Sequence, residues 1–184
     1  MKTKALMIGL LACGSLPWLS ETRVFAQVGP TIVAHPRGLI VTPGSTVSFT
    51  VEATGDPPLR YRWRRGGVTL PGQTNATLVV TNATNSAVYS VIITNLYGTA
   101  ASLRVPLSFF SVGRATNGIA LDINGVFAQY PPLIYQIQYA ISLPVTNWVA
   151  LTNLELPSTL YRYVDTTVTN APQRVYRAIS LPWW

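Results

Sequence analysis

Hydrophobic and polar residues alternate along most of the chain after residue 30, with the period of two that a half-buried β-strand shows. The stretch STVSFTVEA (45–53) is one example, because Val47, Phe49 and Val51 all fall on one face. Similar runs follow, each ended by a turn sequence: LRYRWRR (59–65), ATLVVTN (76–82), AVYSVIITNLYG (87–98) and TAASLRVPLSF (99–109). Strands spaced by roughly 8–12 residues are typical of a sandwich. The pattern therefore predicts an all-β sandwich in the first half of the chain.

The second half of the chain alternates in the same way but has a different texture. Its runs are GIALDINGVFAQ (118–129), LIYQIQYAI (133–141), NWVALTNLEL (147–156), YRYVDTT (161–167) and RVYRAISL (174–181). Asn124 and Gly125 separate two apolar runs, which predicts a hairpin at that point. We expect the module boundary within PLSFFSVGRATNG (106–118) and a second small β-sandwich over residues 110–184.

Residues 1–26 have the plan of a secretory signal peptide. Lys2 and Lys4 precede the apolar run ALMIGLLAC (5–13), and small residues precede the expected cut. That run is shorter than the roughly 20 residues that span a bilayer. We therefore expect a secreted protein, extracellular, periplasmic or on the cell surface, with no transmembrane segment after signal removal. The alternative is a lipoprotein tethered through Cys13, which follows LLA.

Composition and charge narrow the functional classes. Hydrophobic residues make up 48% of the chain and charged residues only 10%, which suits a packed core, while 14 prolines and 13 glycines suit many turns. The 13 basic and 6 acidic residues give a formal charge of +7, and loss of residues 1–26 removes three basic residues and one acid. This surplus aids solubility but does not predict a nucleic-acid partner. Without Cys13 the chain has no thiol for a disulfide, a nucleophile or a metal site.

Several features recur in a fixed order between residues 30 and 109. They are Val51, GDPP (55–58), Trp63 and NSAVYSV (85–91). This segment resembles an immunoglobulin domain of the intermediate type, whose pattern is a cysteine, G-x-P-P, a core tryptophan and D-x-A-x-Y-x-C. The resemblance implies that Tyr89 is the tyrosine of the tyrosine corner, and that Val51 and Val91 stand where the disulfide partners would be. We expect both valines to be buried against Trp63 in place of the disulfide.

A second set of residues follows the plan Y-x-I-Q-x-S-x-x-L-x-x-W-x-x-L, then F/Y-x-D, then R-x-Y-R. The matching residues are Tyr135, Gln138, Leu143, Trp148, Leu151, Tyr163, Asp165, Arg174, Tyr176 and Arg177. This part resembles a small β module found at the ends of secreted bacterial proteins, which implies a fibronectin-like or immunoglobulin-like sandwich. Trp148 is expected in its core. We expect Asp165 to stabilise a turn, or to pair with Arg174 or Arg177 in the closing strand.

The residue types that carry catalysis are scarce. His35 is the sole histidine, so neither a Ser-His-Asp triad nor a metal site of several converging donors is expected. The acids are scattered, apart from Glu52 and Asp56, which flank one turn. The sequence also has no glycine-rich phosphate loop. These observations predict a protein that is not an enzyme and that holds no cofactor or metal.

Four arginines form the most suggestive cluster: Arg60, Arg62, Arg64 and Arg65. Three of them fall on one face of one strand and could grip sulfates, phosphates or uronic acids. The alternative is a solvated face that discourages edge pairing. A sugar-stacking platform is a further alternative, built from Tyr97, Tyr130, Tyr161, Trp183 and Trp184.

The sequence thus predicts a secreted, non-enzymatic protein for binding or adhesion, or a structural accessory, with a protein or polysaccharide partner at the cell surface. This step rests on family analogy. The alternative function is a carbohydrate-binding module that acts alongside a polysaccharide-degrading enzyme.

Overall fold

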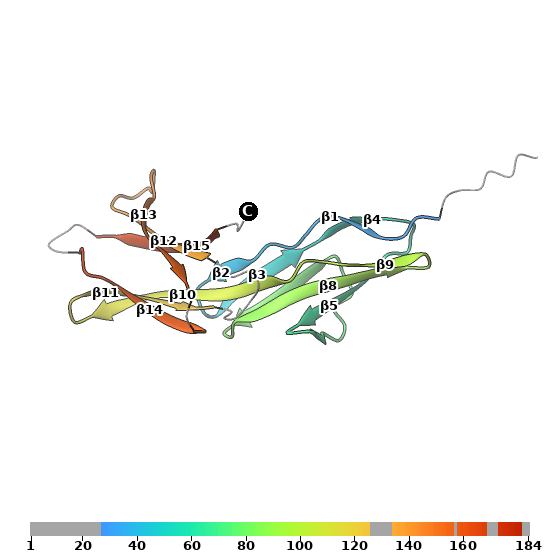
Figure 1. The fold of residues 1–184 in the computed structure, drawn as a ribbon, viewed down its shortest axis with the longest axis horizontal. Coiled ribbons are helices and arrows are strands. Elements are labelled where there is room, and N and C mark those ends of the chain that lie inside the picture. Colours follow the sequence, from blue (N-terminus) through green and yellow to red (C-terminus); the bar gives the residue numbers. More distant parts are fainter. Residues whose placement is uncertain (1–26, 126–133, 157, 169–172, 182–184) are drawn as a thin grey trace, which may run out of the picture.

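The computed structural model describes residues 27–125, 134–156, 158–168 and 173–181. Every helix or strand assigned in these residues is a β-strand, which confirms the all-β prediction, and the molecule is elongated (Figure 1). The described residues contain no helix long and apolar enough to cross a membrane. The expected signal peptide (1–26), Cys13, Tyr130 and the pair Trp183–Trp184 lie outside the described residues.

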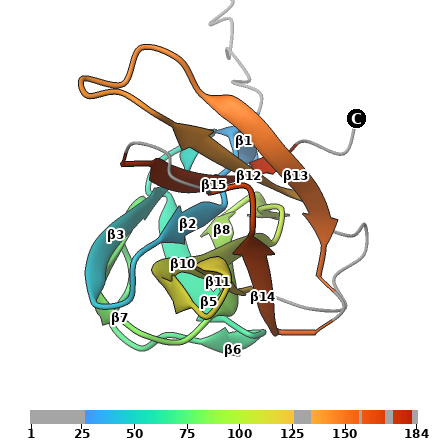
Figure 2. The same ribbon diagram turned by 90° about the vertical axis from the view of Figure 1, so that its left-hand side faces the viewer.

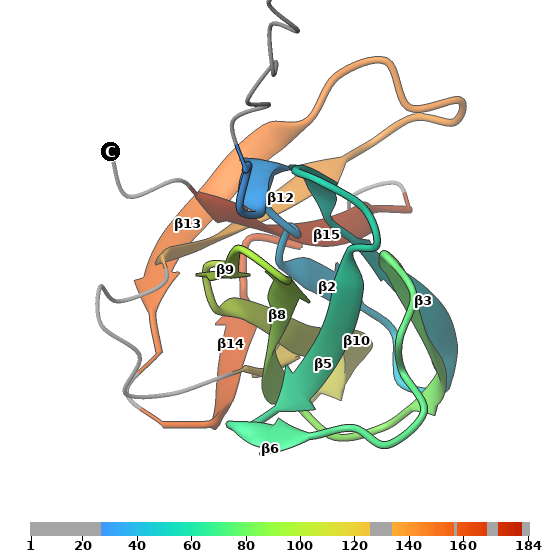
Figure 3. The same cartoon turned by 90° about the vertical axis from the view of Figure 1, so that its right-hand side faces the viewer.

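The first module is a sandwich of paired strands. Its strands are β1 (Thr31–Ala34), β2 (Leu39–Val41), β3 (Ser45–Thr50), β4 (Glu52–Thr54), β5 (Arg60–Arg65), β6 (Val68–Thr69), β7 (Thr77–Ala83), β8 (Ala87–Asn95), β9 (Gly98–Ala101) and the first part of β10 (Val105–Ala115). Antiparallel pairs β3–β7 and β1–β4 form one side. The other side has the order β10-β8-β5-β6, with β2 beside β10 and β9 beside β8. Figure 3 shows β3 set apart from β5, β8 and β10.

The apolar residues that alternate with polar ones in the sequence pack together in the first core. The exposed fractions of four core residues are Val51 2%, Trp63 0%, Tyr89 2% and Val91 0%, and all four belong to one buried cluster. Trp63 and Val91 are direct cross-strand partners between β5 and β8. The Trp63 Nε1–H donates to the carbonyl oxygen of Asn75 at 2.8 Å, so the indole is buried with its polar group satisfied. Each buried valine contributes about 1.5–3 kcal/mol by leaving water.

Strand β10 is shared by both modules and runs along the long axis of the molecule (Figure 1). It pairs with β8 and β2 through residues 105–109, and with β11 through residues 109–115. Residues 105–110 are all buried, because successive side chains point to opposite faces and each face has its own core. Leu107 packs in the first cluster and Phe110 in the second. The expected boundary between residues 109 and 110 therefore falls inside a continuous strand rather than in a linker.

The second module consists of two sheets that share no strand and pack against each other. Its further strands are β11 (Gly118–Asn124), β12 (Ile134–Ala140), β13 (Val149–Glu155), β14 (Leu160–Asp165) and β15 (Val175–Leu181). One sheet continues the long sheet in the order β14-β11-β10, and the other has the order β13-β12-β15. Figure 2 shows β12 and β15 lying over β2 and β10. The core between these sheets contains Leu121, Ile123 and Ile137, each 0% exposed.

In addition to the shared strand, two side-chain hydrogen bonds among the described residues connect the modules. The hydroxyls of Ser108 on β10 and Tyr135 on β12 lie 2.9 Å apart and are both buried. The Ser86 hydroxyl donates to the side-chain carbonyl of Asn124 at 3.0 Å. Ile40 on β2 packs against the second core, although its strand neighbours Leu39 and Val41 pack against the first. The two modules therefore share buried surface.

Two expectations for the second half differ from the structure. β11 does not form the hairpin expected at Asn124 and Gly125, because it pairs with β10 on one side and β14 on the other. The second apolar run of that expected hairpin, after Gly125, lies outside the described residues. The hairpin forms earlier, where Ala115 pairs with Gly118. Trp148 is half-buried and belongs to neither buried cluster, because it precedes β13 and lies against Arg177 rather than between the sheets.

Candidate functional site

The outward side of β5 carries three guanidinium groups, which we call the arginine face (Arg60, Arg62 and Arg64). The alternation that buries Trp63 turns these residues to the other side of the sheet, where Arg60 and Arg62 are exposed and Arg64 is half-buried. Successive residues on this face lie about 6.6 Å apart along the strand. Arg65 has the opposite parity, and its Nη2 donates to the carbonyl oxygen of Asn85 at 3.4 Å. The structure thus groups three of the four predicted arginines and separates the fourth.

The neighbours of the arginine face are uncharged. Its cross-strand partners on β8 are Thr94 opposite Arg60, Ile92 opposite Arg62 and Ser90 opposite Arg64. Beyond β8, Thr99 and Ala101 of β9 continue the same face. The described part of the chain places no carboxylate within 4.0 Å of these guanidinium groups, since its ion pairs are Arg162–Asp122 and Arg174–Asp165. Within the described residues, the positive charge of the face therefore has no carboxylate in direct contact with it.

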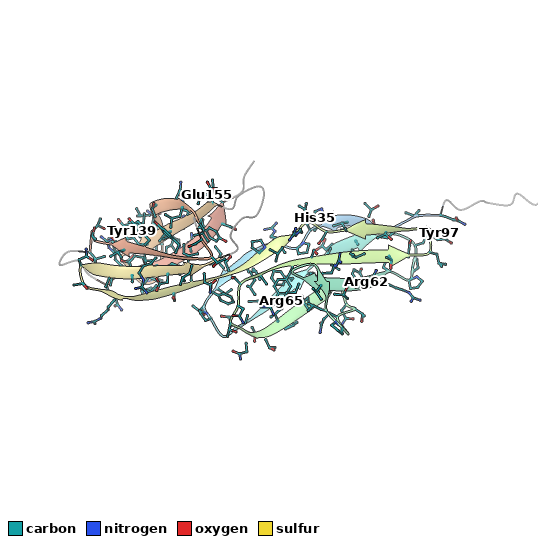
Figure 4. All side chains as sticks on the ribbon, turned by 60° about the horizontal axis from the view of Figure 1, so that its bottom comes forward. His35, Arg62, Arg65, Tyr97, Tyr139 and Glu155 are labelled. Carbon is teal, nitrogen blue, oxygen red and sulfur yellow. The ribbon has the colours of Figure 1, made fainter. Side chains whose placement is uncertain are left out.

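Arg64 differs from its two neighbours in its solvation. Its Nε is buried and has no hydrogen-bond partner. An unpaired buried donor on a cation loses hydration without compensation, so an anion beside this guanidinium is favoured. Figure 4 shows Arg62 and Arg65 on the first module, away from Tyr139 and Glu155 of the second.

A second cluster of charged and polar side chains surrounds Asp165 inside the second module, where it holds the fold together. Asp165 is 0% exposed and accepts hydrogen bonds from Thr167 N at 2.9 Å, Thr167 Oγ1 at 2.7 Å, Arg174 Nη1 at 2.7 Å and Tyr176 Oη at 2.9 Å. The Arg174 guanidinium also lies 4.3 Å from the centre of the Tyr139 ring. Asp165 ends β14 and Tyr176 belongs to β15, so the cluster joins the two sheets of the second module. Asp165 thus stabilises a turn and pairs with Arg174, and both alternatives that the sequence left open occur together.

The hydrogen bonds around Asp165 shift two pKa values. Burial alone raises the pKa of Asp165, but the donors from Thr167 and Tyr176 and the charge of Arg174 outweigh it and hold the pKa below its ordinary value. Burial, followed by the hydrogen bond to Asp165, raises the pKa of Tyr176 to about 12. The carboxylate therefore stays ionised and the phenol stays neutral at physiological pH. Both Asp165 oxygens accept hydrogen bonds within the fold, so this carboxylate holds the second module together.

Arg177 does not join Asp165 but anchors the outer side of the second module. Its guanidinium lies 4.2 Å from the centre of the Trp148 ring, and its Nε donates to Gln138 Oε1 at 2.7 Å. Gln138 in turn donates to Gln136, which donates to Asn153 at 2.9 Å. Sequence reasoning did not find this row of side chains, although Gln136 and Gln138 alternate with buried residues along β12. One face of the Trp148 ring is already covered by a cation, so its role here is packing.

The other candidate groups do not converge. His35 is exposed, and its Nδ1 accepts a hydrogen bond from Leu103 N at 3.1 Å. No group of three or more His, Cys, Asp or Glu residues that could hold a metal occurs among the described residues. Tyr97 lies in the turn between β8 and β9, whereas Tyr161 packs against the second core. Of the proposed sugar-stacking platform, these two described members therefore lie in different modules.

Comparisons with known proteins bear on the first module. Residues 29–95 match the family model of the immunoglobulin domain. Similar solved structures include a chimeric titin Z1Z2 carrying a KLER peptide from decorin, with 32% identity, a TM-score of 0.39 and coverage of 45% of this chain and 95% of that chain. The tandem Ig repeats of Dlar are 22% identical over 44% of this chain and 47% of that chain, with a TM-score of 0.40. No curated protein matches the chain.

A bacterial structure is also similar. It is a quinonprotein alcohol dehydrogenase-like protein from Bacteroides thetaiotaomicron, 19% identical over 50% of this chain and 24% of that chain, with a TM-score of 0.38.

Proposed function

We propose, from the premise that residues 29–95 form an immunoglobulin-like domain, that the protein is a non-enzymatic binding or adhesion protein of the cell surface. The fold alone does not define a function, so the proposal rests on a surface. The observation that carries it is the arginine face, an open side of a sheet with charges that no described carboxylate neutralises. The signal-peptide plan of residues 1–26 supports action outside the cytoplasm.

The architecture suits a protein that holds a binding surface in a fixed position. Because β10 passes without a break from one core to the other, the second module cannot swing freely against the first. A fixed scaffold keeps the guanidinium groups in register and reduces the entropy lost on binding. The second module, with its internally paired Asp165, then serves as a rigid support.

The test of this function uses the full chain, expressed with its own N-terminus in cells of the source organism. Fractionation and surface labelling should find the protein in the envelope or the medium, and purified protein added back should bind intact cells saturably. Protein confined to the cytoplasm, or added protein that cells do not retain, would contradict the proposal. If the variant Arg60→Gln/Arg62→Gln bound intact cells as well as the wild type, the contact with cells would lie outside the arginine face.

A further inference from the structure

We infer that the arginine face binds an acidic polysaccharide, one whose carboxylate or sulfate groups repeat along the chain. This inference rests on the proposed function and names the partner class of the same surface. The face offers Arg60, Arg62 and Arg64 in a straight row on one strand. Guanidinium groups bind carboxylate and sulfate oxygens through paired N–H donors, which a lysine ammonium cannot do.

The spacing of the row favours a polymer over a single small anion. Three same-face residues about 6.6 Å apart extend over roughly 13 Å of β5. A ligand with one charge would satisfy only one guanidinium and leave the others repelling each other. A chain with regularly repeated anionic groups, lying along β5, meets all three.

The residues beside the row favour a sugar chain over a nucleic acid. Proteins that bind single strands place aromatic rings between their basic residues for the bases to stack on. The paired positions beside the arginine face instead hold Ser90, Ile92 and Thr94 on β8, and Thr99 and Ala101 on β9. Tyr61 and Trp63 have the opposite parity on β5, and Trp63 is 0% exposed, so neither indole nor phenol lies in the row. The hydroxyls of this face can bond sugar hydroxyls.

The same residues disfavour a protein partner at this place. Energetically dominant residues at protein interfaces are mostly Trp, Tyr and Arg that fill well-packed, desolvated pockets on the partner. The arginine face supplies arginines, but no aromatic residue stands at its paired positions on β8 and β9. A hydrated, flexible, charged polymer needs neither a pocket nor an apolar centre. Charge complementarity with small hydroxyl neighbours therefore fits a polysaccharide best.

The experiment measures binding of the purified full chain to immobilised polygalacturonate and to heparin, with dextran as a neutral polymer. The test variant is Arg60→Gln/Arg62→Gln, because both side chains are exposed and neither forms a hydrogen bond or ion pair with another described residue. The matched control is Arg37→Gln/Arg114→Gln, which removes the same charge from two other exposed positions. Thermal unfolding of all three proteins checks that the fold is kept.

We expect the wild-type protein to bind both acidic polymers and not dextran, with weaker binding as salt rises. The test variant should lose about tenfold in affinity or more, and the control less than twofold. Equal losses in both variants would overturn the inference, because binding would then follow net charge alone. Equal or tighter binding of a single-stranded oligonucleotide, lost in the same variant, would overturn it in favour of nucleic acid.

Failure of this inference is distinguishable from failure of the proposed function. Protein that binds intact cells but neither acidic polymer keeps the surface role and rejects the polysaccharide. Protein that binds acidic polymers in vitro but stays in the cytoplasm rejects the surface role and leaves the ligand chemistry standing.

Discussion

Replacing Asp165 by Asn should destabilise the second module strongly, although the two side chains have nearly the same size. The substitution removes one negative charge that the fold holds at 0% exposure. The amide has one carbonyl oxygen, so it can keep accepting from Thr167 but then turns its NH₂ towards Arg174 and Tyr176. The Tyr176 hydroxyl can reverse and accept, whereas the Arg174 guanidinium has only donors.

The magnitude follows from what Arg174 loses. A hydrogen bond to a charged group contributes about 1.5–3 kcal/mol, and the arginine side chain, 11% exposed, is left without its anion. Breaking a buried ion pair by removing one partner costs about 3–5 kcal/mol in total. A small domain is stable by only about 5–15 kcal/mol, so this is a large fraction of its stability.

Urea unfolding followed by tryptophan fluorescence and far-ultraviolet circular dichroism measures the loss. The control is Asp122→Asn, because Asp122 pairs with Arg162 at 2.6 Å on the surface and should show a much smaller change. Both variants remove the same charge, and they differ in burial. If Asp165→Asn and Asp122→Asn lowered the free energy of unfolding equally, the internal cluster would not be the tie between the two sheets.

Three further predictions concern stability. The folded-state pKa of Asp165 lies below its unfolded value of about 3.9, so ionised Asp165 contributes its full stabilisation above the unfolded pKa and loses it as pH falls through the folded pKa. The urea midpoint of the wild type should therefore fall more on acidification below about pH 4 than the urea midpoint of Asp165→Asn. Gly118→Ala should cost about 1–3 kcal/mol, because its Cβ would overlap the carbonyl oxygen of Asp165, whereas Gly113→Ala, with open space around it, should melt like the wild type. Val91→Ala removes two methyl groups from the first core and should cost about 2 kcal/mol or more, with exposed Val112→Ala as the control that leaves the urea midpoint unchanged.

Local pattern was sufficient for the longer strands of the first module. Alternation along β3 and β5 identified the buried faces that contain Phe49 and Trp63, because period-two burial is a property of each strand by itself. The same parity placed the arginines on the opposite side before any pairing was known. Separating Arg65 from the row required no more than this parity, and its bond to Asn85 then came from the fold.

Pairing was the part that local pattern could not supply. The hairpin predicted at Asn124 rested on a turn dipeptide, but both edges of β11 are paired with other strands, β10 and β14. Trp148 was expected in the core from its place in the C-terminal sequence pattern, yet Arg177 from β15 covers its ring and it is only half-buried. Both β14, which pairs with β11, and Arg177, which covers Trp148, come from more than twenty positions further along the chain.

The order of amino acids by itself determined that the chain forms strands and which side of each strand is apolar. Those properties depend on side-chain chemistry at positions two apart. Only the tertiary structure decided that residues 105–110 are buried on both faces and join two cores into one body. Burial on the second face requires another sheet to arrive from distant sequence, and no local period records where that sheet will pack.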